Sequence, residues 1–186
     1  IIETLCNAMT DASICRHSYC IIIGGGAVLD AVGFAASVFH RGVNQIRIPT
    51  TVLSQDDSAV GVKNAINHQG VKNLFGTFYP PYAVINDSKF LETLDQRDIL
   101  AGVAEAFKVA IIKDADFYYY MKKNTEGIKK RDIKVLEEVI KRSALLHMDH
   151  ICNSGDPFEK GSSRPLDFGH WAAHKIEALT DHDVKH

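Results

Sequence analysis

The sequence has no long apolar run and no excess of either charge. Apolar runs such as residues 20–23 (CIII) are much shorter than the roughly 20 residues of a membrane-spanning helix. Lysine and arginine number 21 against 23 aspartate and glutamate residues, which gives a net charge of −2. A nucleic-acid-binding domain of this size normally carries a basic excess. These absences argue against both a membrane and nucleic acid as partners, and they predict a soluble protein.

Paired cysteines and a secretion signal are absent as well. The four cysteines form no CxxC pair, and a chain of this length can build its core without disulfides. No basic-then-apolar leader opens the chain. We therefore expect reduced cysteines and a cytoplasmic location. Because the sequence begins without Met and ends at His186 without a polar tail, we also expect it to be part of a longer protein.

The composition is that of a globular protein, with 46% hydrophobic and 24% charged residues among 186. In the first half, short β-branched apolar runs between Gly, Pro and Asn residues predict strands at 20–23, 45–48 and 83–86. The alanine-rich segment 29–39 predicts a buried helix between the first two strands. Strand, glycine turn, helix and strand make a βαβ unit.

After residue 95 the pattern becomes helical. Apolar residues recur there at threes and fours, which gives each helix one apolar face. The two sets are Ile99, Val103, Phe107 and Ile111, and then Ile133, Leu136, Ile140, Ala144, Met148 and Ile151. A third helix is predicted over 167–179, with Asp167 as its N-cap. The sequence thus predicts an α/β domain over 1–95 and an all-helical domain over 96–186, with the boundary within 93–97.

A glycine turn, Gly24-Gly25-Gly26, follows the first predicted strand directly and precedes the helix. Such a turn lets backbone N–H groups approach a phosphate at the positive end of a helix. The motif is neither GxGxxG nor a Walker sequence, and a bare tight turn explains it about as well. Asp30 lies near the start of the helix, where an acid also complements the helix dipole.

A polar segment without strong periodicity runs from residue 49 to 73, and we expect it to form functional loops. Its lysines, with Asn and Thr nearby, suit a phosphorylated, oxygen-rich ligand. A solvated surface loop is the alternative, which composition alone favours slightly.

Metal ligands are available in the second half. Glu105 and Lys108 share one helix face at i,i+3, and His170 and His174 share another at i,i+4. Neutral imidazoles and a carboxylate are the usual ligands of catalytic zinc. With nine histidines in the chain, including His182 and His186, spacing alone leaves the choice of ligands open.

Taken together, the motifs of this sequence resemble the 3-dehydroquinate synthase family, the parent of the sugar-phosphate cyclases. The matching segments are 24–30 (GGGAVLD), 39–43 (FHRGV), 49–53 (PTTVL), 57–63 (DSAVGVK), 72–73 (KN), 90–94 (FLETL), 104–108 (AEAFK) and 169–170 (GH). The resemblance implies an α/β, Rossmann-like nucleotide-binding domain followed by an all-helical metal-binding domain, with the site in the cleft between them. Relative to the family, the chain lacks the first strands and helices and most of the helical region after His186.

The resemblance also implies roles for individual residues. NAD would be held by Gly25, Gly26, Ala27, Asp30, Thr50, Thr51, Lys72 and the 90–93 stretch with Phe90 and Thr93. The metal, zinc or cobalt, would be held by Glu105, His170 and His186. His174 and Glu159 would transfer protons, with Lys63 and Lys108 also at the reaction centre, and His182 would be a bystander. Substrate contacts would come from Asp57, Lys63, Asn73, Lys108 and Asp167. Arg41 matches an arginine that reaches the neighbouring subunit, which implies a homodimer.

The implied reaction is redox-neutral. NAD oxidises a ring hydroxyl polarised by the metal, phosphate is eliminated, the hydride returns, and an intramolecular aldol step closes a carbocycle. Where quinate-forming members carry a lysine and an arginine for the substrate carboxylate, this chain has Asp149 and Ser163, with Arg164 one position displaced, and Asp167 replaces an asparagine. Because like charges repel in a dry cleft, we expect a seven-carbon sugar phosphate and favour one without the carboxylate.

Three alternatives remain at this point. The protein could be a true 3-dehydroquinate synthase, an iron-containing NAD-dependent alcohol dehydrogenase, or a non-catalytic binding protein. Simple hydride transfer does not explain Lys63, Lys72, Asn73 and Glu159, and an intact set of metal ligands and proton acceptors argues against the binding protein.

Overall fold

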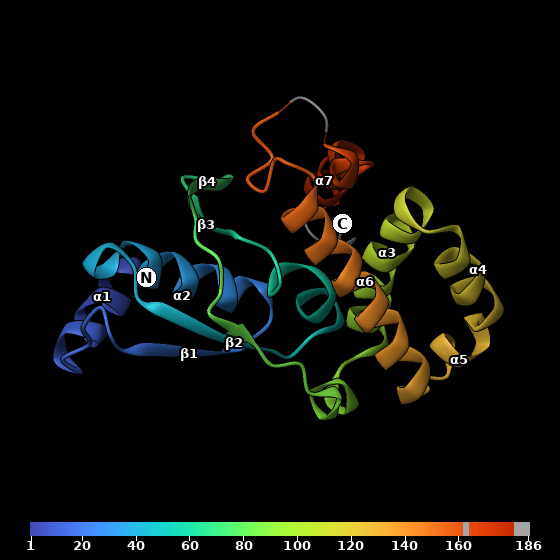
Figure 1. Ribbon diagram of the computed structural model, residues 1–186, viewed down its shortest axis with the longest axis horizontal. Coiled ribbons are helices and arrows are strands. Elements are labelled where there is room, and N and C mark those ends of the chain that lie inside the picture. Colours follow the sequence, from blue (N-terminus) through green and yellow to red (C-terminus); the bar gives the residue numbers. More distant parts are fainter. Residues whose placement is uncertain (162–163, 181–186) are drawn as a thin grey trace.

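The computed structural model describes residues 1–161 and 164–180, apart from the side chains at positions 174 and 178. Figure 1 shows the α/β part at one end, helices α3 to α6 at the other, and α7 above them. None of the described helices is long and apolar enough to cross a membrane.

A parallel sheet forms the α/β part. Its strands are β1 (Tyr19–Gly24), β2 (Asn44–Pro49) and β5 (Ala83–Val84), in the order β1-β2-β5. Helix α2 (Gly26–Val38) connects β1 to β2, whose register pairs Tyr19 with Asn44 and Gly24 with Pro49. The predicted βαβ unit is therefore confirmed. A further helix, α1 (Ile2–Asp11), which the sequence analysis did not predict, packs on α2 through Met9, next to Ala35 and Ala36.

The two faces of the sheet differ in burial. Ile22, Gln45 and Arg47 are almost fully buried on the face that α2 covers. On the opposite face Tyr19, Ile21 and Ile23 are 47%, 61% and 55% exposed. Strand alternation explains the contrast, because successive side chains of a strand point to opposite sides of the sheet.

The prediction of loops throughout 49–73 was wrong for its second half. After a short π-helical turn, η2 (Ser54–Ser58), the chain forms an antiparallel hairpin of β3 (Lys63–His68) and β4 (Val71–Phe78). Gln69 and Gly70 connect the strands, with φ of 49° and 77°. Two residues of positive φ are typical of a tight hairpin turn. A Gln-Gly pair is a weaker turn signal than Asn-Gly, and the mostly exposed strand β4 mixes polar and apolar residues without alternation.

The helical part is built from α3 (Gln96–Lys113), α4 (Ala115–Lys123), α5 (Thr125–Lys129) and α6 (Ile133–Asn153). Its core includes Ile99, Val103, Phe117, Leu136 and Ile140. The predictions for α3 and α6 hold over most of their lengths. Val52 and Leu91, from the α/β part, pack in the same core. The division at 95/96 coincides with the start of α3 and otherwise stays a prediction.

The predicted apolar faces were wrong at their C-terminal ends. Ile111 is 61% exposed and Met148 is 41% exposed. At the end of α6 the buried residues are His147 and His150, because the helix there turns a polar face toward the α/β part.

Helix α7 (His170–Leu179) starts later than predicted. Asp167 belongs to a preceding 3-10 turn, η4 (Pro165–Asp167), and Gly169, with φ of 79°, precedes the helix as its N-cap. A glycine adopts this left-handed conformation without steric cost, so the break falls at Gly169 rather than at the better capping side chain of Asp167. Two further 3-10 turns, η1 (Phe39–Arg41) and η3 (Ser88–Thr93), complete the described elements.

Candidate active site

The glycine turn opens into a cavity between the two parts of the chain. Gly24 ends β1, Gly25 is the N-cap of α2, and Gly26 is its first residue. The cavity has a volume of about 250 Å³ and is lined by Gly25, Gly26, Ala27, Val28, Thr51, Leu53, Asp98 and Ala101. Free N–H groups and the positive end of the helix dipole make this end of α2 suited to a phosphate.

The glycines are needed for close packing around this cavity. A Cβ atom on Gly25 would lie 3.2 Å from Cγ2 of Thr51, and one on Gly26 would lie 3.2 Å from Oγ of Ser58. These are tighter than ordinary van der Waals contacts. The turn therefore leaves bare backbone at the cavity wall, as a pyrophosphate site requires.

A buried arginine holds the segment that follows Asp57. The guanidinium of Arg47 donates hydrogen bonds to the carbonyl oxygens of Ala59 and Gly61, at 3.1 and 2.9 Å, and to Oδ1 of Asn64, at 2.7 Å. Asp30, predicted to contact the NAD ribose, is not among the residues lining the cavity. Burial raises the pKa of Asp30 to about 6, although Arg47 acts in the opposite direction. The role of Asp30 in holding NAD stays a prediction.

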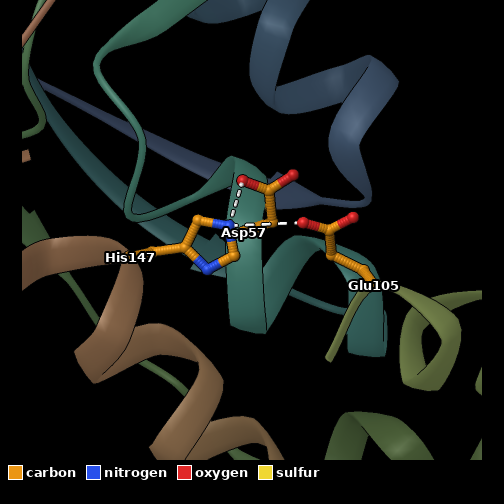
Figure 2. A group of neighbouring side chains, drawn as sticks. All are labelled: Asp57, Glu105 and His147. Atoms are coloured by element: carbon orange, nitrogen blue, oxygen red, sulfur yellow. Dashed lines mark ion pairs between the residues drawn. The ribbon is translucent and has the colours of Figure 1, made fainter. Parts of the chain in front are cut away.

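Three elements far apart in the sequence bring Asp57, Glu105 and His147 together (Figure 2). Nε2 of His147 lies 3.2 Å from Oδ1 of Asp57 and 3.3 Å from Oε1 of Glu105. Asp57 comes from η2, Glu105 from α3 and His147 from α6. Their three ligand atoms all lie within 4.8 Å of one another, which is a geometry that can hold a metal ion.

Lys108 connects this cluster to α7. Its Nζ atom lies 2.7 Å from Oε1 of Glu105 and 3.2 Å from Nε2 of His170. Burial on its own would raise the pKa of Glu105, but His147 and Lys108 beside the carboxylate lower it below its ordinary value. Likewise, burial would lower the pKa of His147, but the carboxylates of Glu105 and Asp57 raise it. Positive charge is therefore stabilised at this point.

A second charged group lies beside the first. Nζ of Lys63, at the start of β3, pairs with Oε2 of Glu159. Nε2 of His150 lies 3.7 Å from Oε1 of Glu159, and Nδ1 of His150 lies 3.1 Å from Nζ of Lys113. The hairpin and the segment after α6 thus meet through two residues that the resemblance places in the site.

The remaining predicted residues lie on several other elements. Lys72 pairs with Glu177 of α7 at 3.0 Å, and the backbone N–H of Asn73 donates to Oδ1 of Asn67. Oδ1 of Asp167 lies 3.5 Å from Nδ1 of His170. Thr50 donates its N–H to the carbonyl of Gly24, Phe90 and Thr93 lie on η3, and Arg41 is exposed at the end of η1. Ser163, His182, His186 and the side chain of His174 lie outside the described residues.

Sequence reasoning missed His147, His150 and Asp56. Asp56 is fully buried, and neither of its carboxylate oxygens has a hydrogen-bond partner within the described part of the chain. Burial raises its pKa well above the ordinary value, and Asp57 and Glu105 raise it further. A signal for His147 was present, because it continues the buried positions Leu136, Ile140 and Ser143 of α6. A polar residue on the buried side of a helix indicates a partner across the interface.

Comparisons with known proteins show the family of the chain. The family model for the N-terminal part of 3-dehydroquinate synthase matches residues 1–101, and the model for its C-terminal part matches residues 102–186. The 3-dehydroquinate synthase of Sulfurisphaera tokodaii is 42% identical over 171 residues, which are 92% of this chain and 48% of the relative. That of Nitratiruptor is 44% identical over 179 residues, which are 96% of this chain and 50% of the relative. The chain spans about half the length of these relatives.

Solved structures place the fold in the same group. A 2-epi-5-epi-valiolone synthase from Streptomyces hygroscopicus, with NAD⁺ and Zn²⁺ bound, matches with a TM-score of 0.89 at 28% identity, over 96% of this chain and 50% of that one. A 2-deoxy-scyllo-inosose synthase complexed with carbaglucose-6-phosphate, NAD⁺ and Co²⁺ matches with a TM-score of 0.88 at 28% identity. The match covers 100% of this chain and 50% of that one. An iron-containing alcohol dehydrogenase from Thermotoga maritima shares the fold alone. It is 14% identical with a TM-score of 0.62, over 97% of this chain and 60% of that one. With its whole length matched by the two family models, the chain belongs to the 3-dehydroquinate synthase family.

Proposed function

We propose that the full-length protein is a sugar-phosphate cyclase that uses NAD and a divalent metal to eliminate phosphate from a seven-carbon sugar phosphate and close a carbocycle. The observation that carries the proposal is that Lys108 contacts both Glu105 and His170, two of the predicted metal ligands. An ammonium group already lies between a carboxylate and an imidazole, so a cation fits there. Bare backbone at Gly25 and Gly26 likewise fits a pyrophosphate.

When bound, NAD would accept and return a hydride, and the metal would polarise the reacting oxygen. The chain's own residues do the rest. Lys63 and Lys108 provide fixed positive charge for the phosphate, a stabilisation that needs no reorganisation during the reaction. The carboxylate of Glu159, held by Lys63, accepts a proton. Asp57 faces the same space and can accept a hydrogen bond from a sugar hydroxyl.

The proposed substrate has a neutral end rather than a carboxylate. Asp167 lies beside His170 and carries a negative charge into the region where the resemblance places the carboxylate pocket. Asp149 is exposed and accepts a hydrogen bond from Asn153 at 2.7 Å, so the repulsion is assigned to Asp167. A negative charge near the substrate's end would repel a second one.

The test compares two substrates in the full-length protein with NAD and Zn²⁺, namely the carboxylated heptulosonate phosphate and sedoheptulose 7-phosphate. We expect phosphate release from the second to be favoured by roughly a hundredfold in kcat/KM, with no net formation of NADH. Asp149→Lys combined with Ser163→Arg should move the preference toward the acid. Efficient turnover of the acid alone would identify a true 3-dehydroquinate synthase, and steady NADH accumulation would identify a dehydrogenase.

The cofactor proposal is tested at the glycine turn. Gly25→Val is expected to lower NAD affinity by about a hundredfold or more, because its side chain fills the space in which the pyrophosphate must approach the backbone. Calorimetric titration with NAD measures the change, and the thermal midpoint reports whether the variant folds. The control is Gly25→Ala with Thr51→Ser, which removes the crowding methyl of Thr51. If this double variant regains full affinity, packing against Thr51 explains the loss and the phosphate site is not at Gly25.

Assembly and location belong to the same proposal. Arg41 is exposed, as expected for a residue that reaches a neighbouring subunit, which supports a homodimer. All four cysteines are unpaired, which supports a reducing, cytoplasmic location.

A further inference from the structure

Arg47 carries a buried charge that the proposed reaction does not use. The residue lies on β2 and is 1% exposed. Burial lowers its pKa to about 10, so the guanidinium stays protonated at neutral pH. Its hydrogen bonds within the described residues go to neutral oxygens, namely the backbone carbonyls of Ser58, Ala59, Gly61 and Tyr79 and the side-chain amides of Gln45 and Asn64. A charge held by neutral acceptors is costly to bury, which indicates that this side chain does more than fill the core.

The contacts of Arg47 converge on one loop. Residues 58–62 join Asp57, on η2, to Lys63, the first residue of β3. Nη1 of Arg47 lies 3.3, 3.1 and 2.9 Å from the carbonyl oxygens of residues 58, 59 and 61. Nη2 donates to Oδ1 of Asn64, directly after the loop, at 2.7 Å. One planar group therefore holds the loop from its first residue to the strand that follows it.

Gln45 fixes the arginine in turn on helix α2. Its Oε1 atom accepts hydrogen bonds from Nε and Nη2 of Arg47, at 3.2 and 3.0 Å. Its Nε2 atom donates to the carbonyl oxygen of Gly33, on α2, at 2.9 Å. Because α2 begins at the cavity proposed for NAD, this chain of contacts connects the loop to the helix that forms the cofactor site.

We propose that Arg47 is a positioning residue that fixes the separation of Asp57 from Lys63 at the substrate. The inference rests on the proposed function for the roles of these two residues. Asp57 faces α6, where Nε2 of His147 lies 3.2 Å from its Oδ1 atom, and Lys63 pairs with Glu159. Since only a short loop separates them in the chain, its shape decides where both groups meet the sugar phosphate. A rigid fork with five N–H donors can fix that shape, whereas a lysine has three donors on a flexible stem.

The experiment measures phosphate release by the full-length protein with NAD and Zn²⁺, from whichever of the two heptulose phosphates named above the wild type turns over. Arg47→Lys keeps the charge and loses the fork. Its kcat/KM is expected to fall by about a hundredfold, because displacing a reacting group by about 1 Å can cost this much. Calorimetric titration should give an unchanged dissociation constant for NAD. The matched control is Arg142→Lys, in which the arginine of α6 that pairs with Asp114 at 3.2 Å is replaced; it should lower the thermal midpoint and leave kcat/KM unchanged.

A double-mutant cycle separates positioning from a general loss of stability. Lys63→Ala removes one of the two groups that the loop places. Adding Arg47→Lys to this variant should then lower kcat/KM by less than about tenfold, because the effects of coupled residues do not add. An equal loss in both backgrounds would show that Arg47 acts elsewhere. If Arg47→Lys does not fold, the same cycle with Gln45→Met decides, since this change frees the guanidinium without removing it.

Two further outcomes separate this inference from the proposed function. If Arg47→Lys lowers the thermal midpoint and keeps the wild-type kcat/KM, the arginine only stabilises the fold, the inference is wrong and the proposed function stands. If the wild type releases phosphate from neither substrate, the proposed function fails and the inference fails with it.

Discussion

Glu105→Ala is expected to abolish turnover in the full-length protein, with a loss of about a thousandfold or more, and to remove the bound metal. Polarisation by a metal is worth several kcal/mol at a developing negative charge, and Glu105, a predicted ligand, contacts both Lys108 and His147. The same joint loss is expected for His170→Ala and His186→Ala. Metal content by mass spectrometry and phosphate release measure the two effects.

His182→Ala is the control for this set and should retain both metal and activity. A protein that loses its metal with His182→Ala and keeps it with His186→Ala would contradict the ligand assignment. A joint loss in all four variants, with lowered thermal midpoints, would indicate a folding defect instead.

Gly102→Ala is expected to destabilise the protein by about 3 kcal/mol, although glycine to alanine normally stabilises a helix by up to about 1 kcal/mol. The reason is a clash between the added methyl group and the segment that precedes η2. A Cβ atom at Gly102 would lie 2.4 Å from the backbone nitrogen of Leu53 and 2.5 Å from Cβ of Val52. Neither atom can move freely, because Val52 is fully buried in the helical core.

Denaturant unfolding of the full-length protein measures the change. Leu100→Ala, at a position of the same helix that is 47% exposed, is the control and should change stability by less than about 1 kcal/mol. NAD affinity should fall with Gly102→Ala, since Leu53 lines the cavity. Equal stability of the two variants would show that α3 does not pack this closely on the segment before η2.

The sequence predicted those parts of the fold in which local pattern and tertiary contact agree. The run at 20–23, the glycine turn and the heptad-like spacing of α6 each carry their own signal. The β3–β4 hairpin does not, because its turn is Gln69-Gly70 and polar and apolar residues do not alternate along β4. His147 was missed for a different reason. Its partners, Asp57 and Glu105, are 90 and 42 residues earlier in the chain, so only the packing of η2 and α3 on α6 shows what it contacts.

The uncovered face of the sheet has a consequence for work with this chain. A parallel sheet is normally covered on both faces, yet Tyr19, Ile21 and Ile23 of β1 are exposed, and within the described residues β1 is also an edge strand. Its free backbone groups offer a template to a strand from another molecule. Material prepared as these 186 residues would therefore self-associate through β1, and its binding constants would describe an aggregate rather than the site.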